Sequence, residues 1–540
     1  MFVVDDRIPA IIVGVLFSIV NALISVYMAY KTGMADGIIF LLLFLSYFVF
    51  LAAGAVKSRA FVYVLAIMMS STAAVIAYTD GLGAIIISGE PFVLSDYAMM
   101  ALLGMSGIIG MLMAVYFEGY FLKGGFPWPG SRVSASIIRL LAAEKRDLQF
   151  RVSTMRMATA GALSGGIALI RGLGAIPETV GLTVAGVSVS PMMIGIGMLI
   201  GVNACLQIAL GAAASLAVLF FVEGAAVDYT THMKNPWVFS TAVSMMVTTA
   251  VITLYVILKP ALREQWGRLR KKTAKVPAVA RDGGHEKRRK PRAQDLLLLA
   301  LIVVAAVMMQ AFAGVPAWIF LVCVPIALLF QVIETRGRAE MSMGVGISSF
   351  IVILLVGLAF SDIVPLLILE GFVVAMVMGF SLALTASMTA EYSNVSRKGL
   401  IGAMAIGSIA GGICCIPIIR FLDGLYGIGT SALPAPYSVM WLEMATTAVN
   451  RVPSPSISIP LVLAGIVIAL VLYRYKISAV SVALGLILPV SLCAALLVGG
   501  VIAWYIAKKG YLKNDNGITA SGLIAGDIVV GLALSLRTLL

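Results

Sequence analysis

The chain has 540 residues, of which 61% are hydrophobic and 12% are charged. A soluble protein of this size keeps roughly 25% charged residues, because its surface must be hydrated. The composition therefore indicates that most of the surface contacts lipid or other apolar helices. Apolar runs long enough to cross a hydrocarbon core of about 30 Å recur from end to end. The alternating segments of about 10 residues that mark a membrane barrel are not seen, so we expect an all-α membrane protein.

The apolar runs, taken in chain order, predict about 14 to 16 membrane spans. The predicted spans are 8–30, 36–54, 61–79, 97–120, 153–173, 190–222, 237–258, 295–311, 315–333, 344–360, 363–384, 400–420, 457–473, 478–507 and 518–536. The two longest, 190–222 and 478–507, are each expected to contain a break. The stretches 126–143 and 433–450 are amphipathic or proline-led and too short to span simply.

The net charge of +13 is concentrated in one segment. Residues 259–292 hold 13 Lys or Arg against three acids, which gives +10. A basic loop between spans is typical of the cytoplasmic side of a cell membrane; binding of anionic lipid or a partner is the alternative, and no nucleic acid is expected. The predicted loop 80–96 carries Asp80, Glu90 and Asp96 without Lys or Arg, which favours the outer side.

Two proline-containing segments suggest that the chain is duplicated. FPWPGS, residues 126–131, lies 307 residues before LPAPYS, residues 433–438. Farther along, Gly197…Gly211 aligns with Gly485…Gly499 at an offset of 288 residues. We therefore expect a first transmembrane half at 1–258, a basic cytoplasmic linker at 259–294 and a second transmembrane half at 295–540.

Signatures of enzymes are missing from the sequence. It contains no GxxxxGK[ST] phosphate loop and no HExxH metal motif. The five cysteines lie in apolar segments without a CxxC pair, and both histidines, His232 and His285, fall in predicted loops. We expect no metal, no cofactor and no histidine-based relay within the membrane. A secondary transporter, a channel or an intramembrane enzyme is left, and no nucleophile–base pair supports the enzyme.

The proline pairs are the strongest pointer to a transport site. Pro127 with Pro129, and Pro434 with Pro436, remove backbone donors and open a helix. Open backbone at membrane depth is tolerated where it is buried in protein or faces a cavity, and the following helix presents amide groups to an anion. Broken segments at corresponding places in two halves indicate a binding site, whereas the alternative is a proline-kinked turn between spans.

Ionisable residues in apolar segments are the next candidates, because a charge at the helix centre costs about 2.5–3.5 kcal/mol. They are Glu118, Asp362, Glu370, Asp423, Glu443 and Asp527. Glu443 and Asp527 are the preferred candidates for proton coupling or substrate contact. Asn203 and Gln207 share a helix face and either line the cavity or join helices by hydrogen bonds. The predicted substrate-binding residues are Pro127, Trp128, Pro129, Gly130, Ser131, Asn203, Gln207, Pro434, Pro436, Tyr437 and Ser438.

Several segments in register resemble the oligopeptide transporter (OPT) superfamily, in its prokaryotic branch related to yellow-stripe-like transporters. The similar segments are NALISVYMAYKTG (21–33), FPWPGSRVSASII (126–138), GLYGIGTSALPAPYSVMWLEMATTAV (424–449), AVSVALGLILPVSL (479–492) and SGLIAGDIVVGL (521–532). The first proline segment departs from the family pattern, and Tyr437 and Asp527 stand where glutamine and glutamate are usual.

The resemblance implies a duplicated bundle of about sixteen helices that moves peptides, modified peptides or metal–chelate complexes by proton symport, and it is consistent with a homodimer. We therefore predict a multi-pass, proton-coupled transporter of oligopeptides or peptide-like molecules that works by alternating access. A metal-chelate carrier is the first alternative and a channel the second. A scaffold would give no reason for the two broken segments.

Overall fold

The structure is a computed structural model of the full chain. It describes residues 7–32, 39–52, 56–91, 94–126, 128–142, 148–180, 186–224, 229–249, 251–252, 255, 293–341, 353, 356–430, 432–452, 455–509 and 516–537. The predicted linker 259–294 lies outside these residues except for its last two.

Helices make up almost all of the described structure, as the sequence predicts. In the first part of the chain these are α1 (Arg7–Thr32), α2 (Ile39–Ala52), α3 (Ser58–Ser88), α4 (Asp96–Lys123), α5 (Pro129–Leu141), α6 (Leu148–Gly172), α7 (Pro191–Ile200), α8 (Val202–Val218), the π-helix η1 (Leu219–Glu223) and α9 (Tyr229–Lys234). The second part contains α11 (Ala293–Phe312), α12 (Ala317–Met341), α14 (Ile363–Tyr392), α15 (Leu400–Tyr426), α16 (Pro436–Asn450), α17 (Ile459–Arg474), α18 (Ala479–Ile487), α19 (Val490–Lys508) and α20 (Asn516–Arg537). Strands β1 (Thr179–Val180) and β2 (Val187–Ser188) form one antiparallel pair.

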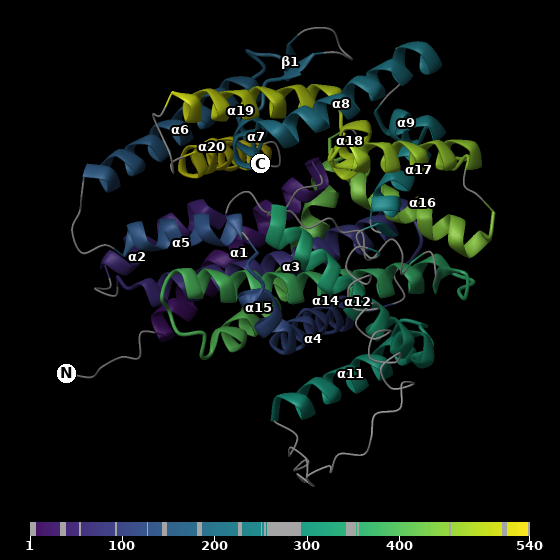
Figure 1. The fold of residues 1–540 in the computed structure, drawn as a ribbon, viewed down its shortest axis with the longest axis horizontal. Helices are drawn as coiled ribbons and strands as arrows, with labels where there is room; N and C mark the ends of the chain where they lie inside the picture. Colours follow the sequence, from purple (N-terminus) through teal and green to yellow (C-terminus); the bar gives the residue numbers. More distant parts are fainter. Residues whose placement is uncertain are drawn as a thin grey trace, which may run out of the picture.

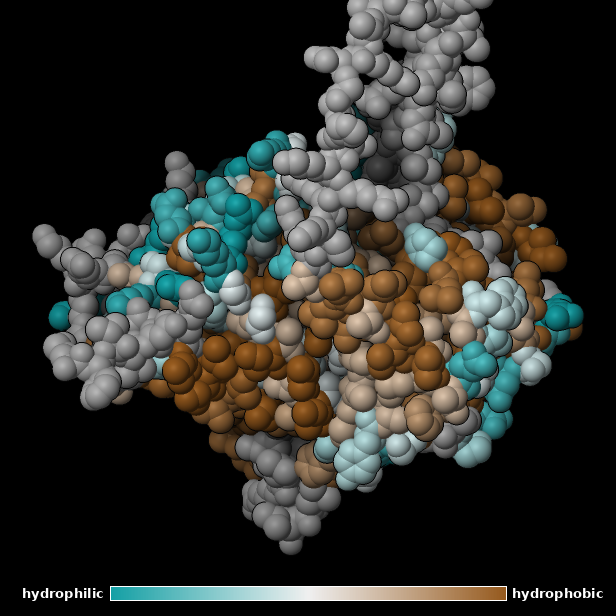
Figure 2. Space-filling model, turned by 90° about the horizontal axis from the view of Figure 1, so that it is seen from below, coloured by the Kyte–Doolittle hydropathy of each residue, from teal (hydrophilic) through white to brown (hydrophobic). Residues whose placement is uncertain are grey.

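Eight helices of the described residues are long and apolar enough to cross a membrane. They are Ile8–Lys31, Ser58–Ser88, Asp96–Lys123, Val202–Glu223, Ala293–Phe312, Ile363–Tyr392, Leu400–Tyr426 and Val490–Lys508. Large apolar side chains are exposed on helices throughout the chain, and Figure 2 shows apolar residues over much of one face. In water such a surface would aggregate, so it fits a lipid environment. The prediction of an all-α membrane protein is confirmed.

Helix boundaries follow local capping rules. The Ser95 side chain accepts a hydrogen bond from the Ala98 amide and starts α4, and Ser190 with Pro191 starts α7 in the same way. Gly89, with φ of 73°, ends α3 in a left-handed conformation. The predicted loop at 80–96 is wrong at its start, because α3 continues to Ser88 and places Asp80 inside the helix. Apolar residues lie both before and after Asp80 in the chain, which explains why the helix is longer than predicted.

The helices form two packed groups, which Figure 1 shows one above the other. The first group is built around α1, α3, α4, α14 and α15, with α5, α11, α12 and α16 on its margins. The second group contains α6, α7, α8, α18, α19 and α20. Each group takes helices from both the first and the second part of the sequence. The space between the groups is thus bounded by segments far apart in the chain.

The second group contains both breaks predicted in the long apolar runs. Gly201, with φ of 84°, separates α7 from α8, and Pro489 precedes α19 after the end of α18. A Cβ atom on Gly197 would overlap the carbonyl of Leu496, and one on Gly485 would overlap the carbonyl of Ile208. Adding 288 to 197 and 208 gives 485 and 496, so the two contacts are equivalent. The same relation joins the contacts Gly211–Val482 and Gly499–Ile194.

Candidate functional site

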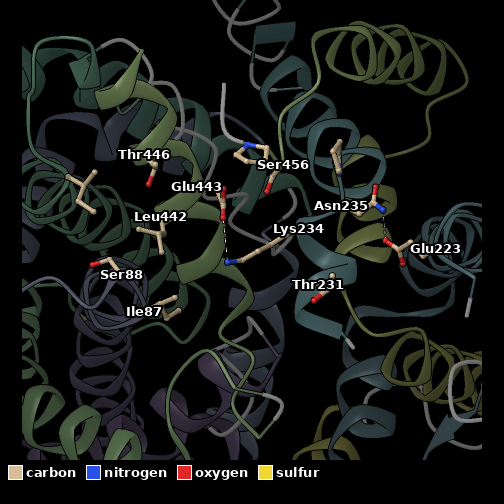
Figure 3. Close-up of a pocket in the computed structure, with 13 residues that line it drawn as sticks. Ile87, Ser88, Glu223, Thr231, Lys234, Asn235, Leu442, Glu443, Thr446 and Ser456 are labelled. Carbon is tan, nitrogen blue, oxygen red and sulfur yellow. Dashed lines mark hydrogen bonds and ion pairs between the residues drawn. The ribbon is translucent and has the colours of Figure 1, made fainter. Parts of the chain in front are cut away.

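A cavity of about 790 Å³ lies between the two helix groups. Its lining residues are Ile87, Ser88, Glu223, Thr231, Lys234, Asn235, Pro236, Ile363, Leu442, Glu443, Thr446, Pro455 and Ser456. The walls therefore come from α3, α14 and α16 on one side and from the η1–α9 region on the other, as Figure 3 shows. Pockets for small ligands measure roughly 300–1,000 Å³, and this cavity is of that size.

Opposite charges face each other across the cavity. The ammonium group of Lys234 on α9 lies 3.5 Å from a carboxylate oxygen of Glu443 on α16. The Glu443 side chain is 14% exposed and that of Lys234 is 44% exposed. The ion pair is accessible from the cavity, and it joins α9, which contacts α8 of the second group through His232, to α16 of the first group.

A hydrogen-bonded chain supports the wall that carries Lys234. The carboxylate of Glu223 binds the Asn235 amide and, at 2.6 Å, the Nδ1 atom of His232. The other ring nitrogen of His232 lies 2.7 Å from the Ser215 hydroxyl on α8. The prediction that both histidines lie in loops is wrong for His232, which is buried on α9. His285 lies outside the described residues.

The second proline segment positions α16. Ala435 has a φ of 46°, and its amide donates a 2.7 Å hydrogen bond to the Tyr30 carbonyl at the end of α1. The Ser438 hydroxyl, in the first turn of α16, donates to the Thr79 carbonyl in α3 at 2.7 Å. These two bonds fix where α16 begins, and Glu443 follows Pro436 by seven residues, which is about two helical turns.

The first proline segment makes the same contacts with a different set of helices. Trp128 has a φ of 42°, and its amide donates to the Ala339 carbonyl of α12 at 2.8 Å. The Ser131 hydroxyl donates to the Thr385 carbonyl of α14 at 2.9 Å. Adding 307 to 128 and 131 gives 435 and 438, so the contacting residues are equivalent in the two segments. Pro127 lies outside the described residues.

The remaining residues of the two proline segments pack within the first helix group. Pro434 and Pro436 are buried, whereas Tyr437 and Gly130 are partly buried. Pro129 begins α5. None of these described residues lines the cavity, which is instead reached through the later turns of α16.

Asp527 lies in the second helix group, where its carboxylate binds Arg171, Ser190 and Met192. One carboxylate oxygen is 2.6 Å from a guanidinium nitrogen of Arg171, and the other accepts hydrogen bonds from the Ser190 hydroxyl and the Met192 amide. Ser190 is the residue that precedes α7, so Asp527 places a negative charge at the start of that helix. The side chain is 4% exposed.

Asn203 and Gln207 lie away from the cavity lining. The Asn203 side chain is exposed on α8. The Gln207 carbonyl oxygen accepts a hydrogen bond of 3.1 Å from the Ser478 amide at the start of α18. For Gln207 the structure therefore shows a hydrogen bond between helices, which was the alternative to lining the cavity.

The structure adds residues that the sequence analysis either did not name as candidates or, for Glu370, named without preferring. Lys234, Asn235 and Glu223 line the cavity, but all three follow an apolar run and resemble an ordinary polar loop. Asp80 and Glu370 lie inside long apolar helices, and Glu370 is 1% exposed. A charge inside a predicted span was the available signal for Glu370.

The described residues form a multi-helical membrane protein with a cavity that carries charges of both signs between two helix groups. The chain matches the family described as OPT oligopeptide transporter protein over residues 8–538, and it belongs to that family. It is therefore a multi-pass membrane protein of the oligopeptide transporter type. No sequence among curated proteins matches it at a significant level.

Proposed function

We propose that this protein is a proton-coupled secondary transporter of oligopeptides or peptide-like small molecules that works by alternating access. The observation that carries the proposal is the pair of opposite charges, Lys234 and Glu443, on facing walls of the cavity. A free peptide carries a carboxylate at one end and an ammonium group at the other. It would exchange the protein ion pair for two charge-assisted hydrogen bonds, the carboxylate to Lys234 and the ammonium group to Glu443.

The other cavity residues suit a peptide between these charges. Asn235 and Thr446 supply donors and acceptors for peptide amides, and Leu442 and Ile363 supply apolar surface for side chains. Ligand sites combine mostly apolar walls with a few polar groups that fix orientation. This mixture supports a peptide-like substrate better than a simple ion.

Alternating access requires two bodies that move relative to each other about the site. The cavity lies where the two helix groups meet, and the Lys234–Glu443 pair joins them. We infer that the groups are those bodies and that substrate binding, by breaking the ion pair, releases one from the other. The equivalent contacts at offsets of 307 and 288 residues support duplicated halves, which supply matched helices to both groups.

The proline segments serve this arrangement by fixing α5 and α16 in the first group. Ser131 bonds to α14 and Ser438 bonds to α3, so each short helix is held against a long buried one. On this proposal the second segment acts on substrate through the helix that it starts. The predicted role of Asp527 in proton coupling stays a prediction, and its bonds to Arg171 and the start of α7 favour a structural role.

The test is uptake of radiolabelled trialanine into proteoliposomes under an imposed proton gradient. The wild-type protein should accumulate the peptide. The variants Lys234→Gln and Glu443→Gln should need a much higher trialanine concentration to reach the same rate of uptake. A double variant with exchanged charges, Lys234→Glu with Glu443→Lys, separates two roles. It restores uptake if the pair only links the helix groups, and it does not if the charges hold peptide ends in one orientation.

Three results would contradict the proposal. Uptake without saturation would indicate a channel. Thermal stabilisation by metal–chelate complexes but not by peptides would indicate a metal-chelate carrier. Equal accumulation with and without the proton gradient would contradict the proposed proton coupling.

A further inference from the structure

Two carboxyl groups lie near each other in the interior of the first helix group, since Gly81, the residue after Asp80, meets the Glu370 carboxyl. Asp80 of α3 and Glu370 of α14 are close enough to interact electrostatically, and the indole of Trp441 on α16 lies against Asp80. Glu370 is 1% exposed, and neither of its carboxyl oxygens accepts a hydrogen bond from a described residue. A buried polar group without a partner is rare and calls for a functional reason.

The surroundings of this pair supply little positive charge. Tyr30 of α1 is close enough to Asp80 to interact with it electrostatically, and Cys415 and Asp423 of α15 lie near Tyr30. Lys31 of α1 donates a hydrogen bond to the Ala432 carbonyl, and Arg338 of α12 contacts Met378, which lies eight residues farther along α14 than Glu370. The ion pairs among the described residues do not include Asp80 or Glu370. Two ionised carboxylates would therefore repel each other here, and a proton on one of them removes the repulsion.

The same helix faces that carry these acids also line the cavity. Ile87 follows Asp80 by seven residues on α3, and Ile363 precedes Glu370 by seven on α14, and both isoleucines line the cavity. Residues seven apart share a helix face, and seven residues span about 10 Å. The two acids thus lie about two helical turns along α3 and α14 from the residues that line the cavity. Trp441, which lies against Asp80, is followed in α16 by Leu442, which lines the cavity.

The two acids differ in access. Asp80 is partly exposed, whereas Glu370 is not. Gly81 faces Glu370, and a Cβ atom there would lie 3.1 Å from a Glu370 carboxyl oxygen and 2.8 Å from the Leu367 carbonyl. The missing side chain at position 81 leaves the space that the Glu370 carboxyl occupies. Of the two acids, Asp80 is therefore the one better placed to exchange a proton with its surroundings.

We propose that Asp80 and Glu370 together form the proton-binding site of this transporter. A hydronium ion transfers its proton to the carboxylate of Asp80 and becomes water, the proton moves to Glu370, and it returns to a water molecule as hydronium when the helix groups change their relative position. Trp441, on the helix that carries Glu443, links the protonation of the pair to the cavity. The inference rests on the proposed function in assigning the proton to coupling, but the site itself is testable without a substrate.

Infrared difference spectroscopy of the full-length protein in lipid is the first test. A pH titration should show the C=O stretching band of a buried protonated carboxylic acid, and Glu370→Gln should remove it. Glu391→Gln, at an exposed position on the same helix, should leave it unchanged. Gly81→Ala keeps both acids and should shift the band, which covers the case in which Glu370→Gln fails to fold. A spectrum that neither variant alters, or a band that responds to sodium instead of pH, overturns the proposal.

Trialanine transport gives the second test. A gradient of about one pH unit can support about tenfold accumulation by one-to-one symport, since a factor of ten in concentration matches one pH unit. Glu370→Gln should abolish this accumulation and keep exchange of labelled for unlabelled peptide close to the wild-type rate. Equal loss of exchange and accumulation would argue for a structural role. If wild type exchanges no trialanine, the proposed function fails, whereas the infrared result still decides the proton site.

Discussion

The ammonium group of Lys234 and the carboxylate of Glu443 meet at 3.5 Å across a cavity between two helix groups. The two residues are separated by 209 positions in the chain and belong to short helices, α9 and α16. The cavity therefore offers one charge of each sign on opposite walls. That arrangement matches the two ends of a peptide.

Neutralising either charge should weaken peptide uptake. We expect Lys234→Gln and Glu443→Gln each to raise the KM for trialanine about tenfold or more, because a hydrogen bond to a charged group contributes about 1.5–3 kcal/mol. The melting temperature should change little, since an accessible ion pair contributes at most about 1 kcal/mol. Lys398→Gln, at an exposed position outside the cavity, is the matched control and should leave KM unchanged. An unaltered KM in both cavity variants would remove them from the binding site.

The start of α16 should depend on a glycine of α3. A Cβ atom on Gly83 would overlap the Ser438 hydroxyl and lie 2.8 Å from the Tyr30 ring. Gly83→Ala should therefore displace α16, lower the melting temperature and reduce uptake. Gly104→Ala is the control, because a Cβ atom at that buried position of α4 meets nothing within 4 Å. That variant should be neutral or stabilising by up to about 1 kcal/mol. Equal behaviour of the two variants would contradict the packing seen here.

The ion pair of Asp527 with Arg171 should matter for stability. Removing one partner of a buried pair typically costs about 3–5 kcal/mol, and Asp527→Asn should therefore unfold at a clearly lower temperature. The double variant Asp527→Leu with Arg171→Met should recover part of that loss. The measurement is thermal unfolding in detergent, followed by peptide exchange. A variant Asp527→Asn with normal stability and exchange but no proton-driven accumulation would instead support the coupling role predicted from the sequence.

His232 should be a stability determinant of the cavity wall. His232→Ala would leave the Ser215 hydroxyl and one Glu223 carboxylate oxygen without their present partner. Each such loss costs about 1–3 kcal/mol, so the melting temperature should fall. Asn203→Ala, at an exposed position on α8, provides the comparison for stability. If the two variants melt at the same temperature, the histidine bonds contribute nothing measurable.

The pattern of apolar residues was enough to predict an all-α membrane protein, because the bilayer requires every spanning backbone group to be bonded within a helix. Breaks within 190–222 and 478–507 were also predictable, since an apolar run longer than one span must turn or break. The structure places them at Gly201 and at Pro489. Proline spacing likewise indicated where α5 and α16 begin.

Contacts between distant segments could not be predicted in this way. Lys234 looks like an ordinary residue after a span until α9 is placed opposite α16, and Asp80 looks like a loop residue until α3 is seen to continue past it. Glu370 was visible as a charge in an apolar run. Its acidic neighbour, and the absence of a hydrogen bond to it from the described residues, depend on how α3 packs on α14. Local sequence specifies helices through periodicity and propensity, whereas the cavity and the buried acid pair arise from helix packing across hundreds of residues.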